Sequence, residues 1–260
     1  MSTDIRTVFE RDGYYIARGL YSSDEIARME ADFDHAVAQI TKSSDNCNAR
    51  WKGKQIDEID GGESEIVHTH NLQMFSGVWQ QAIQNPAFLD VAEAILGPDI
   101  ILHHTKLFQK PNETGAPFPI HQDWEYFPTV KDSMIAGIIH VSEATDEMGC
   151  LRLVPGSHKL GRRPDMRGQS DVSPLADEYP LEKATIIEAE PGDVAFFHYF
   201  TLHGSKPNRS DKTRKTVLVQ LYAGDDEVEA GNEHADMMVP LRGWNHRMTR
   251  ERAVCPKRLH

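Results

Sequence analysis

The sequence has few cysteines, no long apolar run and a shortage of positive charge. Its three cysteines, Cys47, Cys150 and Cys255, stand far apart and form no CxxC pair. This pattern is typical of reduced thiols and argues against a disulfide framework or a thiolate metal site. No apolar stretch could span a bilayer, and the first residues contain neither a basic nor an apolar signal segment. We therefore expect a soluble, cytoplasmic protein with no membrane partner.

The charge balance is strongly negative. The 28 Lys and Arg residues face 40 Asp and Glu residues, which gives a formal net charge of -12. Nucleic-acid binding depends on cationic side chains that neutralise phosphates, so this balance argues against a nucleic-acid partner. A chain of 260 residues with 39% hydrophobic content can bury one substantial core. We expect a single domain over 1–260, with mainly helical support in 1–99, a β core in 100–222 and a C-terminal extension in 223–260.

Helix-end signals mark two helices in the first third. Ser22 and Glu25 form a capping box that precedes apolar residues at helical spacing. Asn85 and Pro86 open a second helix, which Gly97 ends. The polar, glycine-bearing residues 42–65 between them predict a loop that could border a site.

The second half has the pattern of an antiparallel β protein. Short β-branched or aromatic runs alternate with turn residues, including Pro155-Gly156 and Pro191-Gly192. The predicted strands are 100–108, 119–124, 135–141, 150–154, 185–188, 194–198 and 216–222. Together they indicate a mostly β fold with flanking helices, of the sandwich or jelly-roll kind.

The segment 120–124 contains two candidate metal ligands. Side chains alternate along a strand, so His121 and Asp123 in the predicted strand 119–124 point to one face, about 7 Å apart along the chain. His203, on or just after a later strand, is the candidate third ligand. Two imidazoles and one carboxylate with open positions are the donor set of non-haem Fe(II) oxygenases. Arg214, at the start of the next strand, could bind the distal carboxylate of 2-oxoglutarate through its planar fork.

Four segments, HQDWEYFP, GCLRLVPGSHK, PGDVAFFH and LHGSKPNRSDKTRK, resemble the phytanoyl-CoA dioxygenase family of Fe(II)/2-oxoglutarate oxygenases. The resemblance is dense from about Ile100 to Tyr222. It implies a double-stranded β-helix, cupin-like, in which His121, Asp123 and His203 bind iron. It also implies that Arg214 binds 2-oxoglutarate with help from Ser205.

The resemblance further implies an oxidoreductase that uses Fe(II), 2-oxoglutarate and O₂ and releases succinate and CO₂. Related halogenases have a small residue in place of the ligand carboxylate, so Asp123 points to hydroxylation or a related oxidation. Several family members carry a tryptophan about eighteen residues beyond the first ligand, where this chain has Ile139 or its neighbours. The wall of the co-substrate pocket is therefore expected to differ.

The sequence offers four candidate residues for contact with the substrate. His104 and Lys106 share a strand face and could contact an anionic group on a small-molecule substrate. Trp124 and Tyr126 could line the cavity or belong to the core. The basic cluster His158, Lys159, Arg162, Arg163 and Arg167 is either a solvated loop or a lid that attracts an anion. The segment 244–247 could fold back over the opening.

Two other functions remain open at this point. A cupin-like metalloenzyme that does not use 2-oxoglutarate would leave Arg214 without an obvious partner. A non-catalytic barrel that binds a metabolite would have no need of an open iron site. The sequence does not choose a substrate, because one fold serves many chemistries.

Overall fold

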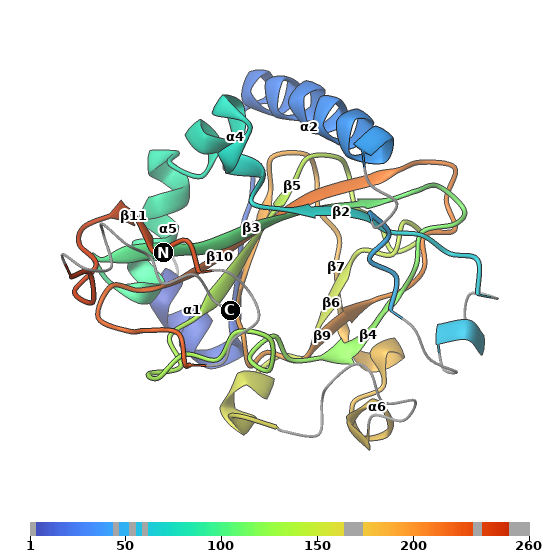
Figure 1. The fold of residues 1–260 in the computed structure, drawn as a ribbon. Coiled ribbons are helices and arrows are strands. Elements are labelled where there is room, and N and C mark those ends of the chain that lie inside the picture. The colour runs from blue at the N-terminus through green and yellow to red at the C-terminus, as the bar shows by residue number, and fades with distance from the viewer. Residues whose placement is uncertain are drawn as a thin grey trace.

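The computed structural model describes residues 4–43, 47–51, 56–58, 62–163, 174–230 and 236–249. Over these residues two antiparallel sheets face each other, one of seven strands and one of four (Figure 1). The large sheet has the order β1-β8-β5-β10-β3-β11, with β2 also paired to β3, and the small sheet has the order β4-β9-β6-β7. Together they form the predicted jelly roll.

The strands of the large sheet are β1 (Tyr14–Ala17), β2 (Val67–His70), β3 (Ile100–Lys110), β5 (Ile135–His140), β8 (Val194–His198), β10 (Arg214–Ala223) and β11 (Val239–Arg242). Those of the small sheet are β4 (Phe118–His121), β6 (Leu151–Leu153), β7 (Thr185–Ile187) and β9 (His203–Ser205). The helices are α1 (Ile5–Asp12), α2 (Ser23–Ser43), α4 (Gly77–Ala82), α5 (Pro86–Leu96) and α6 (Pro174–Glu178), with short 3-10 turns at Leu72–Met74, Ser157–Leu160 and Leu181–Lys183.

Each of the seven predicted strands is present. The largest error lies in the second, which ends at His121 instead of continuing to Trp124. Four strands were not predicted, namely β1, β2, β9 and β11, and each has only three or four residues. So short a run contains too few alternations to show a period of two. The first 99 residues are mainly helical, as expected, but they also contribute two strands to the large sheet.

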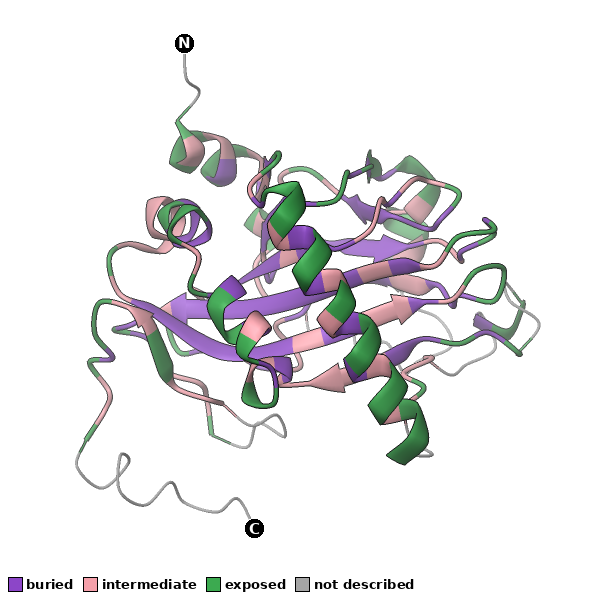
Figure 2. Ribbon diagram, turned by 90° about the horizontal axis from the view of Figure 1, so that it is seen from above, coloured by how far each residue is buried: buried purple, intermediate pink, exposed green. Residues whose placement is uncertain are grey.

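Helix α2 begins as its sequence predicts. The Glu25 carboxylate accepts a hydrogen bond from the Ser22 backbone N–H at 2.8 Å, and the Ser22 hydroxyl lies 3.4 Å from the Glu25 N–H. The apolar stripe of the helix is buried against the large sheet, while its other face stays exposed (Figure 2). Helix α5 likewise starts at the Asn85 cap, whose side chain accepts from Ala87 N, and ends before Gly97.

Strand β10 separates the two cores of the molecule. Val217, Val219 and Leu221 point toward the helices and join the core that α2, α4 and α5 cover. Leu218 points the opposite way, into the space between the two sheets. Because side chains alternate along a strand, Arg214 and Gln220 lie on that same inner face. The space between the sheets is therefore where polar side chains of β10 gather.

None of the helices in the described part of the chain is long and apolar enough to cross a membrane.

A tight turn before β6 brings two distant segments together. Gly149 has a φ of +64°, and a Cβ atom there would lie 2.1 Å from the carbonyl oxygen of Lys206. The carbonyl of Gly149 accepts a hydrogen bond from the buried guanidinium of Arg214. Only glycine combines this backbone conformation with such a close approach.

We predict that Gly149→Ala destabilises the protein more than Gly19→Ala does. Gly19 also has a positive φ, of +58°, but no atom lies within 4 Å of its would-be Cβ. The control therefore measures the left-handed backbone strain alone, about 1–2 kcal/mol. Steric overlap at Gly149 should add about 1–3 kcal/mol to the loss in unfolding free energy, measured by urea denaturation. Equal losses for the two variants would contradict the close approach.

Candidate active site

Two histidines stand opposite each other in the small sheet. His121 ends β4 and His203 opens β9, and the antiparallel pairing places these two residues directly across from one another. Their ring centroids are 4.1 Å apart. Both side chains are buried, with 6% and 7% of their surface exposed. The two imidazoles are thus fixed by the backbone pairing of two short strands.

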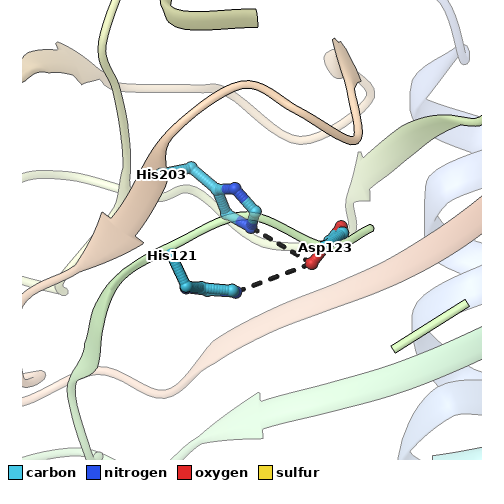
Figure 3. A group of neighbouring side chains, drawn as sticks. All are labelled: His121, Asp123 and His203. Atoms are coloured by element: carbon cyan, nitrogen blue, oxygen red, sulfur yellow. Dashed lines mark ion pairs between the residues drawn. The ribbon is translucent and has the colours of Figure 1, made fainter. Parts of the chain in front are cut away.

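Asp123 completes a group of three (Figure 3). Its Oδ1 lies 3.6 Å from His121 Nε2 and 3.5 Å from His203 Nε2, and the three potential ligand atoms lie within 4.8 Å of one another. The expectation that Asp123 belongs to the same strand as His121 is wrong. The strand ends at His121, and a backbone hydrogen bond from Asp123 N to Tyr199 O then turns the carboxylate inward.

Backbone carbonyls determine the tautomer of both histidines. His121 Nδ1 lies 2.8 Å from Pro119 O, and His203 Nδ1 lies 2.9 Å from Thr201 O. A carbonyl oxygen can only accept, so each Nδ1 must carry the proton and donate it. Each Nε2 therefore presents a lone pair toward Asp123 Oδ1, which is the orientation that a shared metal ion requires.

The electrostatic environment favours the neutral form of His203 and the charged form of Asp123. Burial and the neighbouring His121 lower the pKa of His203 to about 4, so this imidazole is neutral near pH 7. Burial by itself would raise the pKa of Asp123, but His203, His121 and Gln220 lower it overall. Gln220 donates to Asp123 Oδ2 at 2.9 Å. Two imidazoles and one oriented carboxylate could hold Fe(II) or a similar divalent ion.

One cavity of about 150 Å³ connects this group with Arg214. Its wall includes His121, Asp123 and His203 at one side and Arg214, Thr216 and Ser205 at another. Arg214 is buried, its Nη1 donates to Gly149 O, and its Nε has no hydrogen-bond partner among the described residues. Burial lowers the pKa of Arg214 to about 10, and no carboxylate of the described chain pairs with it. Such a guanidinium suits an anionic ligand that enters the cavity.

A buried lysine lies beside Arg214. Lys110 of β3 pairs in register with Arg214 of β10, and its Nζ donates to Ser205 Oγ at 2.6 Å and to Lys206 O at 2.7 Å. Burial, followed by repulsion from Arg214, holds the pKa of Lys110 well below its usual range. Ser205 is therefore oriented by Lys110 while it faces the cavity. Ser205 was expected from the sequence as a binding residue, whereas Lys110 was not.

The residues proposed for substrate contact separate into two groups. Lys106 and Tyr126 line the cavity. His104 and Trp124 are not among its lining residues. His104 is fully buried, with its ring against Phe127, and Trp124 donates from Nε1 to Gln122 Oε1 at 2.8 Å.

Strand β5 decides between Ile139 and its neighbours as residues of the cavity wall. Ile139 points into the helix-covered core, whereas Ile138 and His140 line the cavity. The cavity wall at this place is thus formed by the neighbours of Ile139. Burial and Arg214 lower the pKa of His140 to about 4, so this wall carries a neutral imidazole.

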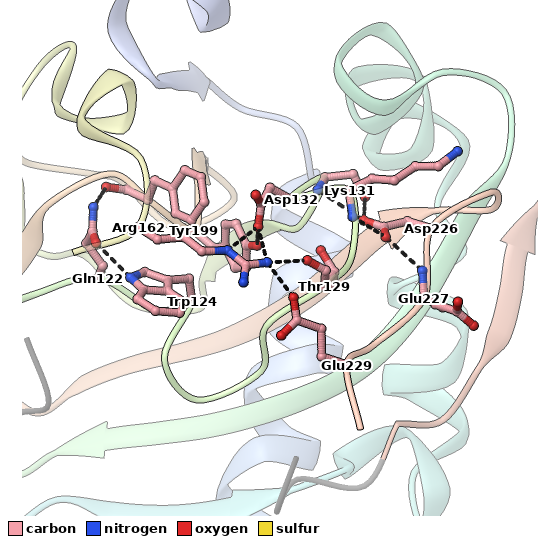
Figure 4. A network of polar contacts seen from close by, with 12 residues as sticks. Gln122, Trp124, Thr129, Lys131, Asp132, Arg162, Tyr199, Asp226, Glu227 and Glu229 are labelled. Carbon is pink, nitrogen blue, oxygen red and sulfur yellow. Dashed lines mark hydrogen bonds and ion pairs between the residues drawn. The ribbon is translucent and has the colours of Figure 1, made fainter. Parts of the chain in front are cut away.

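In the described part of the basic cluster, the cationic side chains contact carboxylates or backbone carbonyls. Arg162 donates to Asp132, Glu229 and the carbonyl of Thr129, and its guanidinium lies over the ring of Trp124 (Figure 4). His158 and Lys159 contact the backbone carbonyls of Glu10 and Arg11. Arg163 lies 3.9 Å from Glu178, and Arg167 lies outside the described residues. Arg162 joins three loops and forms no free cationic patch.

The segment 244–247 lies against the turn before β3 and contributes no residue to the cavity wall. Trp244 N and His246 Nε2 both contact the carboxylate of Asp99, each at 2.8 Å. The residues from 250 onward lie outside the described chain.

Three residues near the site were missed in the sequence. Trp51 packs edge-on against His121 with ring centroids 4.7 Å apart, and it comes from the predicted loop 42–65. Gln220 orients Asp123 and Lys110 orients Ser205. A signal existed for Gln220, because a glutamine interrupts the otherwise apolar run VLVQLY. The isolated tryptophan in a polar segment was a weaker signal.

Comparison with known proteins gives a consistent result. The family model described as Phytanoyl-CoA dioxygenase (PhyH) matches residues 9–216. A probable phytanoyl-CoA dioxygenase of Caenorhabditis elegans is 29% identical over 87% of this chain and 76% of its own length. An ectoine dioxygenase of Stutzerimonas stutzeri is 26% identical over 85% of this chain and 77% of its own length.

Solved structures share the fold. The α-ketoglutarate-dependent carbocyclase SnoK from nogalamycin biosynthesis has a TM-score of 0.72 at 20% identity, with 94% of each chain covered. EctD of S. alaskensis, determined with 2-oxoglutarate and 5-hydroxyectoine, has a TM-score of 0.70 at 22% identity and covers 94% of this chain and 85% of its own. With the family model matched over most of its length, the chain belongs to the phytanoyl-CoA dioxygenase family and is an Fe(II)/2-oxoglutarate-dependent dioxygenase.

Proposed function

We propose that this enzyme hydroxylates an unactivated C–H bond of a small or medium-sized metabolite, with His121, Asp123 and His203 as the iron ligands and Arg214 as the anchor of 2-oxoglutarate. The observation that carries the proposal is the shared cavity. It contains both a facial group of two imidazoles and a carboxylate and a buried guanidinium without a carboxylate partner among the described residues. These are the two attachment points that a metal-chelating dicarboxylate needs.

The residues of the chain supply orientation and a dry environment. When bound, Fe(II) and 2-oxoglutarate would allow O₂ to act as the oxidant: oxidative decarboxylation of 2-oxoglutarate would give succinate and CO₂ with one oxygen atom, and the other atom would enter the substrate. The carbonyls of Pro119 and Thr201 keep both Nε2 atoms aimed at one point, and Gln220 fixes the carboxylate. The aromatic wall excludes water from this point. Its members are Trp51, Phe108, Phe118, Tyr126, Phe127 and Phe197.

Arg214 argues against the alternative of a cupin-like enzyme without 2-oxoglutarate. An uncompensated buried charge costs several kcal/mol, and a site without an anionic ligand would gain nothing in return. Asp123 supports hydroxylation within the family, because its carboxylate occupies the ligand position that a halide would otherwise take.

We predict that His203→Gln weakens Fe(II) binding by at least about 10–100-fold, whereas His198→Gln leaves it unchanged. His198 is a partly buried histidine whose pKa is likewise lowered to about 4 by burial, but its Nε2 lies 3.0 Å from Asp132 O and it does not line the cavity. Removal of a ligand should weaken the metal affinity at least as much as loss of an outer-shell partner, which costs about 10–100-fold. Anaerobic Fe(II) titration by calorimetry measures both variants. Tight binding by His203→Gln would exclude this histidine as a ligand.

We predict opposite effects of Arg214→Met on binding and on stability. The affinity for 2-oxoglutarate, followed by the visible absorption of its anaerobic Fe(II) chelate, should fall by about 10–100-fold, because a charge-assisted hydrogen bond contributes about 1.5–3 kcal/mol. The melting temperature of the ligand-free protein should rise, because an unpaired buried charge is removed.

Arg209→Met is the matched control for this substitution. Arg209 donates to Glu113 O at the surface and does not line the cavity, so neither quantity should change. Unaltered 2-oxoglutarate affinity in Arg214→Met would show that the co-substrate is anchored elsewhere.

A further inference from the structure

Lys106 is a cation of the cavity wall that the binding of iron and 2-oxoglutarate does not account for. Its side chain comes from β3 and faces the cavity. It makes no hydrogen bond or ion pair within the described chain, and its Nζ lies 5.5 Å from the centroid of the Phe108 ring. Burial lowers the pKa of Lys106, and the attraction of Asp123 opposes this effect only in part. A partly buried ammonium of this kind, which lines a cavity and has no acidic partner among the described residues, is stabilised by an anion.

Lys106 and Arg214 occupy different parts of the cavity. Arg214 pairs in register with Lys110, and Leu218 pairs with Lys106. Four residues therefore separate the two cations along the sheet, which corresponds to about 13 Å. Arg214 lies beside Lys110, which donates to Ser205, whereas Lys106 has Leu218 of β10 on one side and His70 of β2 on the other. Lys106 is thus displaced from the anchor of 2-oxoglutarate.

With Fe(II) and 2-oxoglutarate bound, the cavity would carry one excess positive charge, which a further anion would cancel. Asp123 and the two carboxylates of 2-oxoglutarate carry three negative charges, whereas Fe(II), Arg214 and Lys106 carry four positive charges. A buried site with uncompensated charge is unfavourable, so one monoanion completes the balance. Six of the cavity-lining residues are Phe, Tyr or Trp, and Phe108 lies beside Lys106, which suits an apolar body attached to that anion.

We propose that Lys106 binds the carboxylate of the organic substrate and thereby selects carboxylic acids with an apolar body. This inference rests on the proposed function, because the substrate must lie beside the iron for Lys106 to position it. The carboxylate on the ammonium and the apolar body against the aromatic wall hold the substrate from two sides. Lys106 acts on substrate choice and leaves the attachment of 2-oxoglutarate to Arg214.

The test uses paired probes that differ only in charge. The protein is loaded anaerobically with Fe(II) and 2-oxoglutarate, and straight-chain carboxylates from hexanoate to dodecanoate, with the matching primary amides, are titrated in by calorimetry. Lys106→Met retains the length of the side chain without its charge, and Lys106→Arg retains the charge. Lys212→Met removes the same charge from an exposed lysine that pairs with Glu143 and serves as the control.

We expect wild type and Lys212→Met to bind the carboxylates more tightly than the amides. In Lys106→Met the carboxylate affinity should fall by about tenfold or more while the amide affinity stays unchanged, as expected for loss of a charge-assisted contact. Lys106→Arg should retain part of the preference. The absorption of the Fe(II)–2-oxoglutarate chelate should be the same in all four proteins.

Other outcomes would overturn the inference in distinguishable ways. If wild type binds no carboxylate more tightly than its amide, or if Lys106→Met keeps that preference, Lys106 does not select an acid. A weakened 2-oxoglutarate affinity in Lys106→Met, with carboxylate binding unchanged, would assign the lysine to the co-substrate. Failure of the wild-type protein to form the chelate would instead refute the proposed function itself.

Discussion

The pairing of β4 with β9 is the constraint on which the site depends. These strands have four and three residues, yet their register places His121 opposite His203 and brings both Nε2 atoms to one point. Neither imidazole can turn freely, because each Nδ1 donates to a carbonyl of its own strand or the residues just before it. The geometry of this group of three is therefore held by the strand pairing and by hydrogen bonds from the two imidazoles to backbone carbonyls.

The large sheet contributes further polar side chains to the site. Its inner face carries Gln220, Lys106 and Arg214, each on a long strand anchored by neighbours on both sides. Its outer face is held by the helix-covered core, so a displacement of β3 or β10 would disturb the packing of many apolar side chains. The polar inner face is thus supported by an apolar outer face of the same strands.

The site contains buried cations, which lower the stability of the ligand-free protein. Arg214 and Lys110 are buried next to each other, and the pKa of each is lowered by burial. Buried cations without an acidic partner are destabilising. The glycine turn at Gly149, which approaches Lys206 too closely for a side chain, is part of the arrangement that holds Arg214. This pattern is typical of a binding site that a ligand neutralises, because a site built for stability alone would contain apolar residues there.

The sequence by itself determined the parts that depend on local pattern. Capping residues defined α2 and α5, alternation defined the long strands, and the spacing of His121, Asp123, His203 and Arg214 indicated the chemistry. Tertiary structure alone decided that β4 ends before Asp123. It also decided that Lys106 lines the cavity, whereas His104 is buried and does not line it. Trp51 reaches His121 from a loop far away in the sequence. The reason is physical: periodicity reports which face of an element is apolar, whereas a cavity is formed by side chains of elements far apart in the chain, whose meeting no local pattern encodes.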